Sequence, residues 1–310
     1  MLRTLAAGAV LTVATCSLAT AQTAMSARSV LVSVSDASGQ PIIGLLPEDF
    51  LLDANGMAIE ALEATPARYP LVILVDTGTA AREFVTTFRA PLRKLVERTA
   101  LSPIAVVTFG DTPVFAVKFT PDAQRASKGL NGLFARPETP SYLMDGLHRV
   151  AEEVKRMEVP VVDAIVVTAP SFDASRRDTD RLVRDLLASH VRVHVVAHRT
   201  RVSGNSATPA PKAGRSVTSA DMMVYTAREQ VAVLTDIARS TGGSLQQVDL
   251  QGGLDDALQQ IHARHLGEYI VDYIMPATDK PESLRLKVRL PGTRVTMMSL
   301  TPAMDESKKE

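Results

Sequence analysis

Cysteine is almost absent from this sequence of 310 residues. The single cysteine, Cys16, lies in the apolar core of an N-terminal segment that has the pattern of a cleavable signal peptide. Cleavage of that segment leaves a chain without cysteine. The mature protein is therefore expected to have no disulfide, no thiol nucleophile and no cysteine-ligated metal.

An excess of charge of either sign is also absent, because 34 basic residues are balanced by 34 acidic ones. Nucleic acids and anionic membranes attract strongly basic surfaces, so we expect no nucleic-acid partner. Beyond the N-terminal segment, no apolar run approaches the roughly 20 residues that a transmembrane helix requires. We therefore expect no transmembrane segment.

The N-terminal segment predicts export. Arg3 is followed by a long apolar stretch and then by the sequence ATA at residues 19–21, an A-x-A cleavage site. We expect a signal peptide at residues 1–21 and a mature protein in the periplasm or outside the cell. Lipidation of Cys16 is the less favoured alternative, because Thr15 is bulkier than the residue that usually precedes a lipidated cysteine.

Recognisable catalytic motifs are missing too, including the G-x-S-x-G nucleophile motif. His194 and His198 are four residues apart in a predicted strand, where such residues lie about 13 Å apart, too far to share a zinc ion. His262 and His265 are three apart on a predicted helix without an apparent third ligand, and we interpret them as an exposed pair. We predict a protein that is not an enzyme and has no catalytic residues; an unrecognised hydrolase or a stability scaffold is the alternative.

Between residues 68 and 262, apolar runs alternate with helical patterns. The runs are LVILV, IAVVTF, AIVVT and VRVHVVA, at 71–75, 104–109, 164–168 and 191–197. Continuous Val- and Ile-rich runs of this length are typical of parallel strands buried on both faces. The region therefore predicts an α/β fold with a doubly wound, mostly parallel sheet. A stretch rich in Ser, Gly and Pro at 200–220 predicts a long exposed loop.

Segments with β-strand patterns flank this region. They cover residues 27–67, which include an Asn55-Gly56 hairpin turn, and residues 265–301. Each segment must bury its apolar face, so we expect the two to pair with each other in a β-sandwich-like module. Separate packing of each on the α/β core is the alternative. Residues 302–310 are predicted to be a solvated tail.

Several segments together carry a family resemblance. In open parallel sheets, ligands bind at the carboxyl ends of the strands, and Asp76 directly follows the first buried run. LVILVDTGTA, IAVVTFGD, SYLMDGL, AIVVTAP and VLTDIARSTGG, in that order, resemble von Willebrand factor type A domains. The flanks GQPIIGLLPEDFLLDANG and HLGEYIVDYIMPATDKPESLRLKVRLPG are similar to those of the exported bacterial "VWFA-related" family. The motifs are specific in combination, although each is weak alone.

The resemblance implies a metal-ion-dependent adhesion site. In that site a D-x-S-x-S loop, a threonine and a second aspartate ligate Mg²⁺, and an acidic group of the partner completes the coordination. Asp76 matches the first aspartate, whereas Gly78 and Ala80 stand where the family has serines. Ser141 stands for the threonine and keeps a hydroxyl, but Ala169 stands for the second aspartate.

A site that has lost one carboxylate and both loop hydroxyls should bind Mg²⁺ poorly. We therefore predict a degenerate adhesion site without a metal cofactor, in which Asp76 caps the following helix. The function predicted is that of an exported, non-enzymatic protein-interaction or adhesion module with an unidentified protein partner. Metal-dependent adhesion through Mg²⁺ at Asp76 and Ser141 is the alternative.

Overall fold

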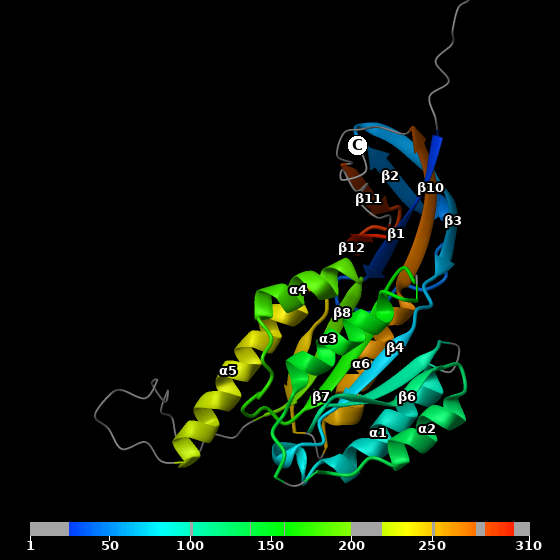
Figure 1. Ribbon diagram of the computed structural model, residues 1–310. Helices are drawn as coiled ribbons and strands as arrows, with labels where there is room; N and C mark the ends of the chain where they lie inside the picture. Colours follow the sequence, from blue (N-terminus) through cyan, green and yellow to red (C-terminus); the bar gives the residue numbers. More distant parts are fainter. Residues whose placement is uncertain are drawn as a thin grey trace, which may run out of the picture.

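The computed structural model describes residues 25–99, 102–136, 138–157, 159–199, 219–249, 252–276 and 283–300. The predicted signal peptide at 1–21, most of the predicted loop at 200–220 and the predicted tail at 302–310 lie outside these ranges. Two six-stranded sheets make up the fold. One belongs to an α/β half and the other to an antiparallel half, which lies at the top of the molecule in Figure 1.

The predicted doubly wound, mostly parallel sheet is confirmed. Its strand order is β6-β5-β4-β7-β8-β9, and only β6 runs antiparallel to its neighbour. The central strands are buried on both faces, as their uninterrupted Val and Ile runs require. The strands are β4 Leu71–Val75, β5 Ile104–Thr108, β6 Val114–Thr120, β7 Val162–Thr168, β8 Val191–His198 and β9 Leu245–Val248.

Helices cover both faces of this sheet. One face packs against α1, α2 and α6, and the other against α3, α4 and α5, so that two apolar cores form, one on each side. The helices are α1 Val85–Arg98, α2 Ala123–Asn131, α3 Leu143–Val154, α4 Thr179–Ala188, α5 Ser219–Ser240 and α6 Leu254–Leu266, with a short 3-10 helix η2 at Thr79–Ala81. Among the helices within the described ranges, none combines the length and apolar character that a membrane span needs.

The predicted pairing of the N-terminal and C-terminal strands is also present. The antiparallel sheet has the order β11-β2-β3-β10-β1-β12, and β1 pairs with β10 from Met25↔Pro276 to Ser33↔Glu268. The elements are β1 Met25–Ser35, η1 Pro47–Asp49, β2 Phe50–Ala54, β3 Met57–Pro66, β10 Glu268–Pro276, β11 Leu284–Val288 and β12 Arg294–Ser299. Asn55 and Gly56, both with positive φ, form the predicted β2–β3 turn.

The antiparallel half takes the form of one curled sheet, where the sequence predicts something like a sandwich of two. Strands β11 and β12 stand at opposite ends of the strand order, yet they contact each other. The inner face encloses its own apolar core, which includes Val32, Phe50 and Tyr269. Curling lets a single sheet bury its apolar face without a second layer, because antiparallel strands twist strongly. Figure 1 shows β10 and β1 running side by side through this curled sheet.

Candidate functional site

Asp76 lies at the carboxyl end of β4, at the edge where ligands bind in folds of this kind. Its side chain is buried, with 1% of the residue exposed. Oδ1 accepts a hydrogen bond from the Gly78 N–H at 2.9 Å. Oδ2 accepts one from the Thr168 hydroxyl at 2.9 Å and one from the Ala169 N–H at 3.3 Å. The carboxylate therefore ties β4 to the end of β7.

This geometry corrects the prediction that Asp76 caps a helix. Neither η2, which follows Asp76, nor α1 receives a side-chain hydrogen bond at its N-cap. Burial raises the pKa of Asp76 to about 6, although its three hydrogen bonds act in the opposite direction. The negative charge of Asp173 adds slightly to the rise. The Asp76 side chain therefore does not cap a helix. It stabilises the turn at Gly78 and links β4 to the end of β7.

Gly78 occupies the place of the first serine of the implied adhesion site, and the backbone there is tightly enclosed. A Cβ atom at this position would lie 3.2 Å from the Thr139 carbonyl oxygen and 3.3 Å from Asp76 Oδ1. Gly110 also packs here, so closely that its own added Cβ would clash with the Gly78 nitrogen. Ala80, in the place of the second serine, is exposed to solvent. A serine side chain at Gly78 would therefore require these neighbours to move by a few tenths of an ångström.

Ser141 and Ala169 are the two remaining predicted positions. Ser141 is 2% exposed, and its hydroxyl has no hydrogen-bond partner among the residues that the structure describes. Ala169 is buried, and its N–H already donates to Asp76. The structure thus brings Asp76, Gly78 and Ala169 into contact. It leaves the Ser141 hydroxyl unused.

Asp173 is a further carboxylate in this region that the sequence analysis missed. It follows Ala169 by four residues and forms an isolated bridge with Ser141. Oδ1 accepts from the Ser175 N–H at 2.9 Å and Oδ2 from the Met144 N–H at 3.2 Å. Burial raises its pKa. An acidic residue in the loop after the third apolar run was the signal that could have identified it.

These residues fit a Mg²⁺ ion poorly. A carboxylate offers about four acceptor positions, and three of those on Asp76 are taken by the protein itself. Both oxygens of Asp173 accept backbone N–H groups. Mg²⁺ needs free oxygen ligands in near-octahedral geometry. Among the described His and acidic residues, none at this edge forms a group of three at ligand spacing.

A pocket of about 980 Å³ opens beside the Asp76 loop. Its wall combines apolar and polar groups, and Phe172, whose surface is 64% exposed, borders it. The lining residues include Ala80, Glu138, Pro140, Ser141, Pro170 and Phe172. A concave surface bordered by an exposed aromatic residue is typical of a site where a ligand or a partner binds.

A second group of polar side chains lies at the opposite end of the parallel sheet, next to the antiparallel half. Arg192 on β8 donates from Nε to Asp163 Oδ1 on β7 at 2.7 Å, and from Nη1 to Glu268 Oε1 on β10 at 2.7 Å. Its Nη2 donates to the Tyr69 hydroxyl at 2.5 Å, and Tyr69 also bonds Glu268. Burial alone would raise the pKa of Asp163, but the positive charge of Arg192 holds it well below its usual range.

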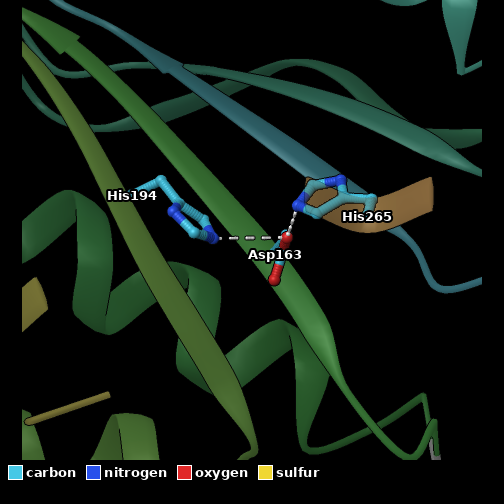
Figure 2. Close-up of side chains that lie close together, drawn as sticks. All are labelled: Asp163, His194 and His265. Atoms are coloured by element: carbon cyan, nitrogen blue, oxygen red, sulfur yellow. Dashed lines mark ion pairs between the residues drawn. The ribbon is translucent and has the colours of Figure 1, made fainter. Parts of the chain in front are cut away.

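Two histidines join this group, as Figure 2 shows. His194 Nε2 lies 3.5 Å from Asp163 Oδ2, and His265 Nε2 lies 2.5 Å from the same oxygen. His265 has a side chain only 14% exposed, so the interpretation of His262 and His265 as an exposed pair is wrong. His198 lies elsewhere, with its ring centre 4.4 Å from that of Phe84. The spacing of the histidines along the sequence gives no indication of Asp163, which lies on a different strand.

No protein-family model and no curated protein matches the sequence. Among solved structures, proximal thread matrix protein 1 from the mussel byssus aligns at 11% identity and a TM-score of 0.51, over 69% of this chain and 50% of that chain. A von Willebrand factor type A structure from Catenulispora acidiphila aligns at 11% identity and a TM-score of 0.48, over 88% and 73%. An aerotolerance-related membrane protein from Bacteroides fragilis aligns at 13% identity and a TM-score of 0.47, over 64% and 98%. At such identities the likeness concerns the fold alone: the α/β half is similar in fold to these structures, one of which is a von Willebrand factor type A structure.

Proposed function

We propose that this protein is an exported, non-enzymatic module that binds another protein at the carboxyl edge of its parallel sheet, without a metal ion at Asp76. One observation carries the proposal: the hydrogen bonds of Asp76 are directed to its own chain, beside a pocket bordered by an exposed phenylalanine. The ATA site and the apolar stretch before it support export.

The hydrogen bonds of the Asp76 carboxylate support partner binding that needs no metal ion. A metal at this position would have to replace the donors from Gly78, Thr168 and Ala169, and these donors hold β4 and β7 together. The backbone around Gly78 is tightly packed, and Gly78 lacks the hydroxyl that a complete site supplies. The Asp76 carboxylate is therefore better explained as a structural link than as a ligand.

The shape of the edge supports a protein as the partner. Phe172, Pro140 and Pro170 supply rigid apolar surface around the pocket, and a buried aromatic residue often contributes a large part of the binding energy at a protein interface. Charged side chains of Arg82, Glu83 and Glu138 also line the pocket. They would surround the apolar contact with a polar rim.

The absence of an activated nucleophile supports a non-enzymatic role. Within the described part of the chain, the Ser141 Oγ makes no hydrogen bond. A serine nucleophile requires a base within hydrogen-bond reach. Ser141 has no such base among the described residues, and Thr168, whose hydroxyl donates to Asp76, is fully buried.

Crosslinking and affinity capture test this proposal. A photocrosslinking amino acid at position 172 should capture a specific envelope protein, and Phe172→Ala should abolish recovery of that protein. Leu62→Ala is the matched control, because Leu62 is 59% exposed on β3 of the antiparallel half, and this variant should bind normally. EDTA should leave binding unchanged. Equal capture by the Phe172→Ala variant would contradict the proposal.

Metal-dependent adhesion remains the second candidate, because the buried Ser141 hydroxyl has no partner among the residues described and Asp173 lies beside it. It predicts that EDTA abolishes partner binding and that added Mg²⁺ restores it. Asp76→Asn should then abolish binding as well. The same assay therefore separates the two candidates.

A further inference from the structure

We propose that Asp163, His194 and His265 form a binding site for a transition-metal ion, with Zn²⁺ the best match. This site lies at the amino end of the parallel sheet, at the junction with the antiparallel half. It is therefore at the opposite end of the sheet from Asp76, and the proposal does not depend on the proposed function. The residues come from β7, β8 and the last turn of α6.

The spacing of the three ligand atoms suits one small cation. One carboxylate oxygen of Asp163 and one imidazole nitrogen from each histidine all lie within 4.8 Å of one another. Zinc binds nitrogen and carboxylate oxygen at about 2.0–2.2 Å, which places tetrahedral ligands about 3.3 Å apart. The separation of 3.5 Å between His194 Nε2 and Asp163 Oδ2 is close to this value. The shorter separation to His265 requires that ring to move outward slightly.

The histidine nitrogens that face Asp163 lie close to its Oδ2 but make no well-aligned hydrogen bond with it. Among the described atoms, Nε2 of both His194 and His265 is buried without a hydrogen-bond partner, although Asp163 Oδ2 is near. His194 has a side chain only 4% exposed, so water cannot readily satisfy this nitrogen. Buried polar groups are nearly always paired in native proteins. A metal ion between the rings and the carboxylate would use all three atoms as ligands.

Surrounding groups hold two of the ligands in the required orientation. His194 Nδ1 lies 3.0 Å from the Ser244 hydroxyl. If Nδ1 donates to that oxygen, the lone pair on Nε2 is directed toward Asp163. Arg192 fixes the Asp163 carboxylate through Nε at 2.7 Å and Nη2 at 3.1 Å. Histidine metal ligands in proteins are usually supported in this way by a second hydrogen bond.

The charge of the region also favours a cation. Asp163 and Glu268 carry two negative charges, and Arg192 neutralises only one of them. With both imidazoles neutral, one negative charge remains in a buried place. A divalent ion would offset it. Two imidazole ligands favour zinc over Mg²⁺ and Ca²⁺, which prefer oxygen.

An ion could reach the site from solvent. A pocket of about 230 Å³ is lined by His265 together with Tyr69, Arg98 and His262. The pocket borders His265 but neither Asp163 nor His194, so an ion would have to pass the His265 ring. Three protein ligands leave a fourth coordination position on the ion. His265 lies three residues before Glu268, the first residue of β10. A bound ion would therefore fasten the connection between the α/β half and the antiparallel half.

Calorimetric titration of the metal-stripped, purified chain with ZnCl₂ tests the proposal. We expect one Zn²⁺ per chain and a rise in melting temperature, with no response to MgCl₂ at the same concentration. His194→Gln and His265→Gln should each abolish zinc binding. His262→Gln is the matched control, since His262 lies one turn earlier on α6 and outside the cluster. That variant should bind zinc like the wild type.

Imidazole ¹⁵N NMR of the wild-type chain covers the case in which a variant fails to fold. Zinc should shift the Nε2 resonances of two histidines, and those of the other four should stay in place. Absence of zinc binding by the wild type would overturn the proposal and leave a metal-free ion-pair cluster. Zinc binding that needs His262 and not His194 would overturn it as well. Neither result would bear on partner binding at Phe172.

Discussion

The Thr168 hydroxyl donates a hydrogen bond to Asp76 Oδ2 at 2.9 Å, and this contact joins the ends of two neighbouring parallel strands. Both residues are fully buried or nearly so. In a metal-binding site of the implied type, the aspartate would face an ion. Here the Asp76 carboxylate bonds to its own sheet. Its hydrogen bonds should therefore contribute to the free energy of unfolding, which can be measured.

The ionisation of Asp76 should make stability depend on pH. Its pKa is about 6 in the folded protein, above the ordinary value of 3.8. Folding favours the protonated form of Asp76. Its stabilising contribution to the free energy of unfolding is therefore fully present below about pH 4 and is lost as pH rises through 6. A rise of this size corresponds to a loss on the order of 3 kcal/mol.

Asp76→Asn should remove this component of the pH dependence. The measurement is the free energy of unfolding by urea at several pH values between 4 and 7, for wild type and variant. The difference between the two proteins should change between about pH 4 and pH 6 and become constant above that. A constant difference would show that Asp76 does not titrate near pH 6.

Thr168→Val should destabilise the protein, because it leaves Asp76 Oδ2 with only the Ala169 N–H as a donor. A hydrogen bond to a charged group contributes about 1.5–3 kcal/mol, so we expect a loss of that order at pH 7. Thr235→Val is the control, since Thr235 is exposed and its hydroxyl donates to the Val231 carbonyl of its own helix. It should change the free energy of unfolding by less than about 0.5 kcal/mol. Equal effects of the two variants would argue against the Asp76 link.

The fold could be predicted from the sequence because several independent local patterns indicate it. Continuous apolar runs such as residues 71–75 indicate strands that are buried on both faces. Asn55-Gly56 indicates a tight hairpin turn, because both residues readily adopt positive φ. The curled form of the antiparallel sheet was not accessible in the same way. It depends on the approach of β11 to β12, and no local pattern encodes that contact.

The candidate sites show the same limit. Asp76 could be placed at the strand end from its position after LVILV, but its partner Thr168 is 92 residues away along the chain. Asp163 interrupts an apolar run, which indicates a buried charge that needs partners. Its partners His194, Arg192 and His265 become neighbours only through strand register and the end of α6.

Arg192→Met should be strongly destabilising. Arg192 is the shared hydrogen-bond partner of Asp163 and Glu268, which have side chains only 0% and 4% exposed. Removing one partner of a buried ion pair usually costs about 3–5 kcal/mol, because the remaining charge stays buried. Arg239→Met is the control, since its pair with Asp236 is on the surface and should contribute about 0–1 kcal/mol. Urea unfolding of both variants at pH 7 measures the difference, and similar losses would contradict the structural role of the network.

Gly110→Ala should displace the Asp76 loop, although Gly110 is not part of that loop. A Cβ on Gly110 would lie 2.1 Å from the Gly78 nitrogen and 2.3 Å from the Thr77 carbonyl carbon, and both are backbone atoms that cannot turn away as a side chain can. The loop would have to move, which weakens the hydrogen bond from Gly78 to Asp76.

We expect Gly110→Ala to lower the free energy of unfolding by about 1–3 kcal/mol, as overpacking generally does, and to reduce partner binding at the neighbouring pocket. Gly252→Ala is the control, because an added Cβ there meets no atom within 4 Å and its φ is not in the left-handed region. It should leave stability and binding unchanged. If Gly110→Ala lowered stability yet bound the partner normally, the binding surface would have to lie away from the Asp76 loop. If the folded fraction of Gly110→Ala lost partner binding while Gly252→Ala bound normally, the conformation of the Asp76 loop would be required for partner binding.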